Sequence, residues 1–123
     1  MVNEYSAGMV EARIWGYLAV TDSGTGYCVK RLRIGPGAMH SLHRHRHRDE
    51  YWVIVSGKAR VTHDGKEMDV ETGGSVHLKA GTLHRIANPG TSDLIAIEVQ
   101  IGSVLAESDI ERVEPAKPPH KPA

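Results

Sequence analysis

The sequence has a single cysteine, Cys28, and no net charge. One cysteine excludes an intrachain disulfide and a zinc module built from several thiolates, so we expect a reduced, cytoplasmic setting. Lysine plus arginine and aspartate plus glutamate number 15 each, which argues against a nucleic-acid binder, since such domains are usually basic overall. No apolar run approaches the roughly 20 residues of a membrane helix, and the first residues lack the apolar segment of a signal peptide. We therefore expect neither nucleic acid nor membrane as a partner.

Short runs rich in valine, isoleucine, tyrosine and tryptophan, separated by glycine, aspartate, asparagine and proline, predict a chain of β-strands. We expect strands over residues 15–21, 27–34, 42–47, 51–56, 59–63, 66–70, 75–78, 84–88 and 94–101. Only residues 104–113 leave room for one short turn or helix. Many short strands at regular spacing predict an all-β sandwich or barrel in a single domain. We expect residues 1–10 to form an N-terminal arm, 11–114 the barrel and 115–123 a flexible proline-rich tail.

Histidine and arginine alternate in SLHRHRHRDE, residues 41–50. Because successive side chains of a strand point to opposite faces, the alternation predicts a histidine row and an arginine row on opposite faces: His43, His45 and His47 against Arg44, Arg46 and Arg48. Two histidines at i and i+2 can reach one metal ion, and Glu50 can join them if the chain turns after His47. His84 follows a glycine corner and is the best fourth ligand. A solvated histidine row and an arginine arm for a polyanion are the alternatives.

The spacing around these histidines is regular. Gly37 is followed by AMHSL, His43-Arg44-His45, RHRD, Glu50, YWVIVS and Gly57. A second pattern runs from Gly73 through GSVHL, Lys79-Ala80-Gly81, TL, His84, RIA and Asn88. Both patterns resemble the two motifs of the cupins, with Lys79 in place of the usual proline. The resemblance implies a cupin double-stranded β-helix, or jelly-roll barrel, whose divalent metal (Zn, Mn, Fe, Ni or Co) would be held by His43, His45, Glu50 and His84.

Within the cupins, the chain resembles the C-terminal domain of type II mannose-6-phosphate isomerases. Residues 13–17, 26–38, 47–62, 80–90 and 97–114 carry this resemblance. In that family the first ligand position is often glutamine, with the H-x-H pair shifted by two. The alternative ligand set His45, His47 and Glu50 therefore stays open beside the set that begins at His43.

The isomerase resemblance implies a metal-dependent enzyme that moves a proton between adjacent carbons of a sugar phosphate. Arg85, beside the ligand His84, Arg48 in the family's H-R-x-E position, and Lys30 would be the catalytic or pocket residues. Arginine and lysine suit a phosphate. No residue stands out as the general base. The alternatives are a Fe or Mn dioxygenase and a non-catalytic sugar-binding cupin. We expect a homodimer, since pairing protects exposed sheet edges.

Overall fold

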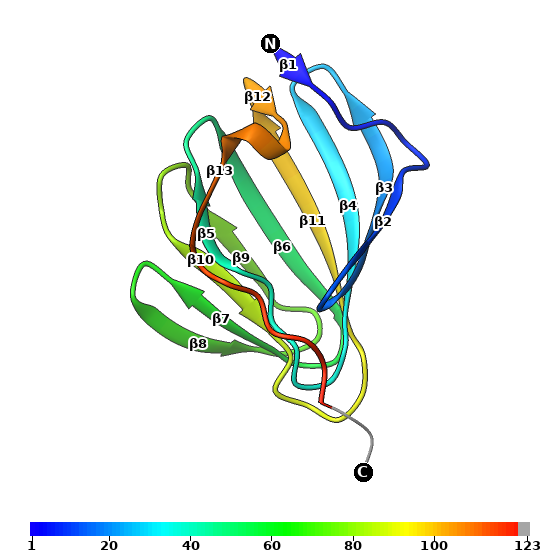
Figure 1. The fold of residues 1–123 in the computed structure, drawn as a ribbon, viewed down its shortest axis with the longest axis vertical. Helices are drawn as coiled ribbons and strands as arrows, with labels where there is room; N and C mark the ends of the chain where they lie inside the picture. The colour runs from blue at the N-terminus through cyan, green and yellow to red at the C-terminus, as the bar shows by residue number, and fades with distance from the viewer. Residues whose placement is uncertain (121–123) are drawn as a thin grey trace.

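A computed structural model describes residues 1–120 of the chain (Figure 1). In this range the regular elements, in chain order, are β1 (Val2–Asn3), β2 (Val10–Arg13), β3 (Gly16–Gly24), β4 (Tyr27–Ile34), β5 (Leu42–His45), β6 (Arg48–Ser56), β7 (Ala59–His63), β8 (Lys66–Val70), β9 (Ser75–Leu78), β10 (His84–Ala87), β11 (Leu94–Gly102), β12 (Val104–Leu105), the 3-10 turn η1 (Glu107–Asp109) and β13 (Ile110–Glu114). No helix among these residues is long and apolar enough to cross a bilayer.

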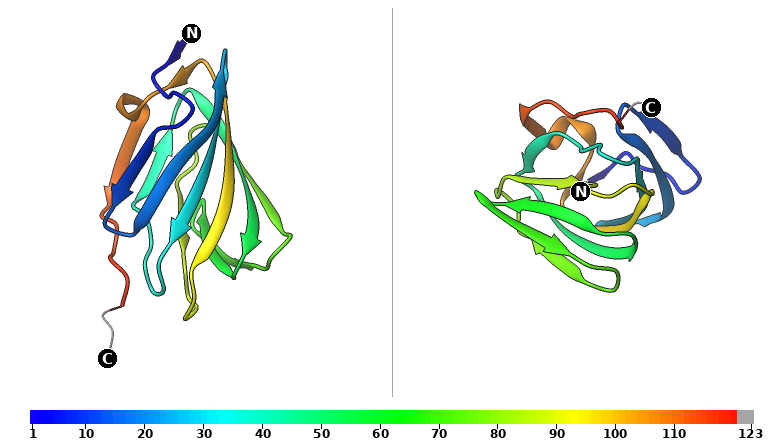
Figure 2. Two further views of the ribbon diagram at one scale, coloured as in Figure 1. Left: turned by 90° about the vertical axis from the view of Figure 1, so that its right-hand side faces the viewer. Right: turned by 90° about the horizontal axis from the view of Figure 1, so that it is seen from below.

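Two sheets face each other and enclose the interior (Figure 2). The larger sheet has the order β2-β3-β4-β11-β6-β9, and the smaller has the order β13-β5-β10-β7-β8. The hairpin between β7 and β8 shows why the chain turns where it does. Asp64 and Gly65 both have positive φ, 52° and 81°, as a type I′ turn requires, and this turn matches the twist of the strands it joins.

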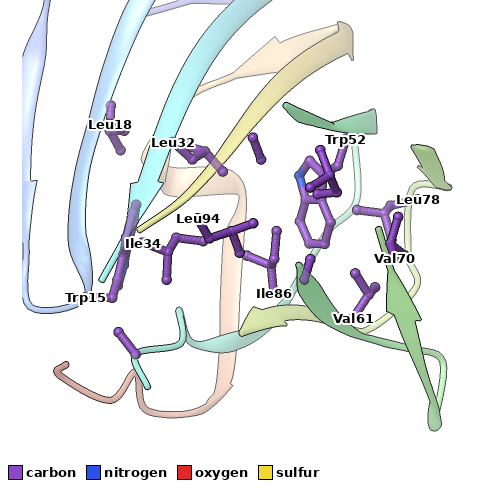
Figure 3. Packing of buried hydrophobic residues seen from close by; sticks show 14 of the residues in the cluster. Trp15, Leu18, Leu32, Ile34, Trp52, Val61, Val70, Leu78, Ile86 and Leu94 are labelled. Carbon is purple, nitrogen blue, oxygen red and sulfur yellow. The ribbon is translucent and has the colours of Figure 1, made fainter. Parts of the chain in front are cut away.

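The apolar core fills the space between the two sheets (Figure 3). Trp52 and Ile54 of β6 point inward and are fully buried, as are Ile86 of β10, Val61 of β7 and Leu94 of β11. Inward and outward positions alternate along these strands, because side chains of a strand alternate between faces. The all-β architecture that the sequence predicts is confirmed.

Both ends of the described chain lie against the barrel. Tyr5 is 7% exposed, although it precedes the first long strand. Near the other end, Lys117 bridges to Met39, and the backbone N–H of His120 donates to the carbonyl of Pro36 over 2.9 Å. The boundaries at residues 11 and 115 stay predictions, and residues 121–123 of the expected flexible tail lie outside the described residues.

Candidate metal centre

Four donor side chains converge between the two sheets. His43 and His45 lie on β5, Glu50 lies on β6, and His84 begins β10. Each residue offers one donor atom, and these atoms all lie within 4.8 Å of one another. None of the four residues is more than 9% exposed. Both sheets thus contribute to one buried group of three imidazoles and a carboxylate.

Strand pairing brings these residues together from distant parts of the chain. His84 is the register partner of His43 in the antiparallel pair of β10 and β5. A hydrogen bond also holds the turn before β10 against the end of β5, since the Gly81 N–H donates to the carbonyl of His45 over 2.6 Å. His43 and His45 both face inward because they are two residues apart on a strand.

Hydrogen bonds to the outer ring nitrogens orient two of the imidazoles. His84 Nδ1 lies 3.2 Å from the carbonyl oxygen of Thr82 and must carry the proton of that bond. Its Nε2 then presents a lone pair to the cluster. His43 Nδ1 is bonded to the Ser41 hydroxyl over 2.8 Å, which leaves its Nε2 toward the interior. In metal-binding histidines, a hydrogen bond at the ring nitrogen that does not bind the metal fixes the tautomer and the ring orientation.

Several polar atoms in the cluster have no hydrogen bond within residues 1–120. Glu50 Oε1 and His84 Nε2 are both fully buried and unpaired, although they lie only 3.3 Å apart. Buried polar atoms without partners are costly. Two such atoms aimed at one point, beside two more imidazoles, fit the donor set of a divalent transition metal.

The charges of the cluster also suit a cation. Burial alone would raise the pKa of Glu50, but His45 and Arg48 hold it well below its ordinary range, so the side chain is a carboxylate. Burial and the neighbouring His40, His84 and His45 lower the pKa of His43, which keeps that imidazole neutral. Metal ligands must be deprotonated, so both groups are in the required form.

The predicted sorting of histidines and arginines to opposite faces is wrong beyond His45. The strand ends there, and a bend at Arg46 and His47 changes the alternation. The His47 side chain is 55% exposed and its Nδ1 bonds to Asp109 over 2.7 Å, outside the cluster. Arg48 points inward instead, with Nε 3.0 Å from Glu50 Oε2.

Lys30 and Arg48 line the cavity beside the cluster, whereas Arg85 does not. Lys30 is 3% exposed, and its Nζ lies 3.5 Å from the centre of the Tyr5 ring. Arg85 donates to the carbonyls of His40 and Pro115 over 3.0 and 2.8 Å and to Glu114 over 3.2 Å. It alternates with the inward His84 and therefore faces away from it, and its expected catalytic role stays a prediction.

A cavity of about 330 Å³ opens from the cluster toward solvent. His43, His45 and Glu50 form part of its wall, and the remaining wall is mixed apolar and charged. Its other lining residues include Trp15, Leu18, Leu32, Lys30, Arg48, Glu98, Gln100, Glu107 and Arg112. A cavity of this size suits a small polar metabolite.

The polar wall residues that sequence reasoning missed include His40, Glu98 and Gln100. A signal for two of them was present, because inward positions of the apolar strand LIAIEVQI hold Glu98 and Gln100. Two polar residues at buried positions of a central strand indicate a site. His40 packs against the ring of His43 at 4.8 Å between centroids, and burial lowers its pKa to about 3.

The family described as mannose-6-phosphate isomerase C-terminal matches residues 3–115. The chain is 45% identical over 102 residues to the alginate biosynthesis protein AlgA of Pseudomonas aeruginosa, covering 83% of this chain and 21% of that protein. It is 39% identical over 112 residues to mannose-1-phosphate guanylyltransferase of Salmonella muenchen, covering 91% and 24%. The chain thus spans about a quarter or less of these relatives.

Solved structures share the fold. A conserved protein with a double-stranded β-helix domain from Klebsiella pneumoniae superposes with a TM-score of 0.70 at 20% identity, covering 90% of this chain and 84% of the other. A cupin barrel protein from Salinispora arenicola gives 0.63 at 21% identity, covering 70% and 75%. At such identities the likeness shows the fold alone, and it confirms the predicted cupin double-stranded β-helix.

Proposed function

The chain belongs to the mannose-6-phosphate isomerase C-terminal family, and from this premise we propose that it is a metal-dependent isomerase of a sugar phosphate. The observation that carries the proposal is the buried group of His43, His45, Glu50 and His84, which opens into a cavity whose wall includes Lys30, Arg48 and Arg112. The relatives are named for guanylyl transfer and alginate biosynthesis, but this chain covers only 21% and 24% of their lengths. Guanylyl transfer is therefore not assigned to this cupin domain.

The four side chains would hold one divalent cation. Zn, Mn, Fe, Ni and Co all accept imidazole with a carboxylate, so the donor set does not choose among them. When bound, the cation supplies Lewis acidity to a substrate oxygen as negative charge develops. Arg48 fixes the carboxylate of Glu50 through its 3.0 Å bond, and the bonds to Ser41 and Thr82 hold the imidazoles of His43 and His84.

The cavity walls supply positive charge for a phosphate. Lys30 and Arg112 both line the cavity, and among residues 1–120 neither has a carboxylate within 4.0 Å. Arg48, by contrast, is already paired with Glu50. Since an unpaired guanidinium binds phosphate through two parallel hydrogen bonds, we assign Arg112 to the phosphate and Lys30 to the developing charge of the sugar.

The test combines metal content with turnover. Wild type, His45→Ala, His84→Ala and the surface control His77→Ala are purified, loaded with Zn, Mn, Fe, Ni or Co, and analysed for bound metal. Wild type and His77→Ala are expected to hold one ion per chain and to convert mannose 6-phosphate in a coupled assay. The two cluster variants should lose both properties. Loaded wild type that binds the sugar phosphate without turning it over would make the protein a binding module, and unchanged metal content in the cluster variants would remove the site.

We propose further that the chain acts in the cytoplasm as a homodimer. Support for dimerisation comes from exposed apolar side chains on the outer face of β6 and β11: Tyr51, Val53, Val55 and Ile101 are 36–50% exposed. Paired sheets bury such faces in many β-sandwich assemblies. Light scattering coupled to size exclusion gives the mass directly, and a monomer at micromolar concentration would rule the dimer out.

A further inference from the structure

Isomerisation of an aldose needs a base beside the carbon that loses its proton, and three carboxylates line the cavity: Glu50, Glu98 and Glu107. Glu50 belongs to the metal cluster and is paired with Arg48. Glu107 is 44% exposed in its side chain and is paired with Arg13 over 2.8 Å. Only Glu98 is buried, lines the cavity, and makes no ion pair within 4.0 Å among residues 1–120.

The register of the large sheet places Glu98 directly beside the metal cluster. On β11, Glu98 pairs with Lys30 of β4 on one side and with Trp52 of β6 on the other. Two residues further along, Gln100 pairs with Glu50. All of these side chains face inward, so Glu98 lies one row away from the ligand Glu50.

Hydrogen bonds hold the Glu98 carboxylate in a fixed position. Its Oε2 accepts from Trp52 Nε1 over 2.8 Å, and its Oε1 accepts from Gln100 Nε2 over 2.7 Å. The same Gln100 nitrogen donates to Glu50 Oε2 over 3.1 Å. One amide group thus spans the two carboxylates and sets the distance of Glu98 from the cluster.

We propose that Glu98 is the general base and acid of the isomerisation, an inference that rests on the proposed function. Each carboxylate oxygen has two acceptor sites, and the two hydrogen bonds use one on each oxygen. The remaining lone pairs are available to a substrate proton. A fixed and largely dry carboxylate is well suited to proton transfer from carbon.

The step balances without a co-reactant. Glu98 takes the proton from C2 of the open-chain aldose, the C–H electron pair forms the C1=C2 double bond, and the carbonyl electrons move to O1. The resulting carboxylic acid returns the proton to C1, while a proton passes from O2 to O1 and C2 becomes the carbonyl. Lys30, the cross-strand partner of Glu98, faces the charge that appears on the oxygens.

The electrostatic setting supports this role. Burial, followed by the charge of Glu50, raises the pKa of Glu98, whereas Glu50 is held in its ionised form. Acid–base catalysis often uses two carboxylates in one cavity whose surroundings give them different pKa values.

The test compares Glu98→Gln with wild type and with the exposed control Glu67→Gln. Metal content and the Kd for mannose 6-phosphate are measured first, and loss of the C2 proton signal in D2O is then followed by NMR. We expect Glu98→Gln to keep metal and sugar binding and to remove the C2 proton at least about 100-fold more slowly, the usual contribution of a positioned base. Glu98→Asp, with the carboxylate withdrawn by one methylene, should bind normally and exchange slowly.

The outcomes separate the inference from the proposed function. If loaded wild type removes no C2 proton, either by exchange with D2O or by transfer to C1 of the ketose, the isomerase function and the role of Glu98 fail together. If wild type exchanges and Glu98→Gln remains within a few-fold of it, the isomerase stands and the base lies elsewhere. If Glu98→Gln loses metal or sugar binding, or does not fold, while Glu98→Asp exchanges at the wild-type rate, Glu98 has a structural role and the inference is overturned.

Discussion

Trp52 holds a buried carboxylate of the cavity through one hydrogen bond, from its Nε1–H to Glu98. Trp52→Phe keeps most of the ring in the core but leaves a buried carboxylate oxygen without its donor. Such a loss costs about 1–3 kcal/mol, and we expect urea unfolding followed by circular dichroism to show a decrease of this size. Trp15→Phe is the matched control, because Trp15 is also buried and its Nε1 has no hydrogen-bond partner among residues 1–120. Equal losses in the two variants would show that ring volume matters and the bond does not.

The ionisation of Glu107 makes the free energy of unfolding depend on pH. Burial alone would raise its pKa, but Lys30, the hydroxyl of Tyr5 and Arg13 lower it below the ordinary 4.5. The Glu107 carboxylate therefore binds a proton less readily in the folded state than in the unfolded state. Its ionised form stabilises the fold at pH values above the unfolded pKa, and this stabilisation is lost as the pH falls through the folded pKa. Glu107→Gln should be less stable than wild type near neutral pH.

The measurement is the free energy of unfolding of Glu107→Gln and wild type at about pH 7 and at an acid pH below the folded pKa of Glu107, where the linkage contribution is respectively present and lost. The difference between the two proteins should shrink toward zero in acid. Glu67→Gln, at an exposed carboxylate 3.8 Å from Arg60, should stay within about 0.5 kcal/mol of wild type at both values. A difference for Glu107→Gln that grows in acid would reverse the sign and refute the argument.

At the scale of elements, the strand pattern in the sequence predicts the nine strands β3 to β11. The predicted ranges 27–34, 59–63, 66–70 and 75–78 coincide with β4, β7, β8 and β9, since alternation and glycine turns are local signals. The short strands β1, β2, β12 and β13 were missed. Strands β1, β12 and β13 are defined by pairing with partners distant in the chain, such as β1 with β12, and no local pattern reports that, whereas β2 pairs with the adjacent β3.

The sequence also predicts the candidate site only in part. Motif spacing predicted the four residues that the structure brings together. Regular alternation wrongly placed Arg48 on the outer face, because a bend after His45 restarts the pattern and the sequence carries no clear signal for it. Glu98 and Gln100 could have been found as polar residues at the buried positions of β11.

The bend between β5 and β6 is held from outside by one side chain of η1. Asp109 accepts from the backbone N–H groups of Arg46 and His47 over 3.3 and 3.0 Å, and it bonds to His47 Nδ1 over 2.7 Å. Asp109→Ala leaves these donors without their acceptor, which should cost about 1–3 kcal/mol. Because the bend sets the spacing from His45 to Glu50, metal affinity should fall as well, as measured by titration against a competing chelator.

Glu111→Ala is the control for this element. It removes a carboxylate that pairs with Arg44 and Arg46 on the outer surface, where ion pairs contribute at most about 1 kcal/mol. Metal affinity should be unchanged in this variant. If Asp109→Ala and Glu111→Ala behave alike in both measurements, the bend does not depend on Asp109.

On the scale of the whole molecule, one barrel serves as a core at one end and a site at the other. The inward positions of β11 run from Leu94 and Ala96 to Glu98 and Gln100, and all four are buried. Cross-strand partners follow the same gradient, with Ile34 and Leu32 opposite the first pair and Lys30 opposite Glu98. The apolar end can stabilise the fold while the polar end carries unpaired donor atoms.

Metal binding should therefore stabilise the entire domain and not only the cluster. The donor atoms come from both sheets, so a bound ion links them, and a ligand at about 100 times its Kd adds about 2.7 kcal/mol to the folded state. For a domain of this size that corresponds to a rise in Tm of roughly 10 °C. Melting curves of chelator-treated and metal-loaded wild type measure the rise, and His84→Ala should show none while His77→Ala shows all of it. A rise that persists in His84→Ala would mean that the stabilising ion binds somewhere other than between the sheets.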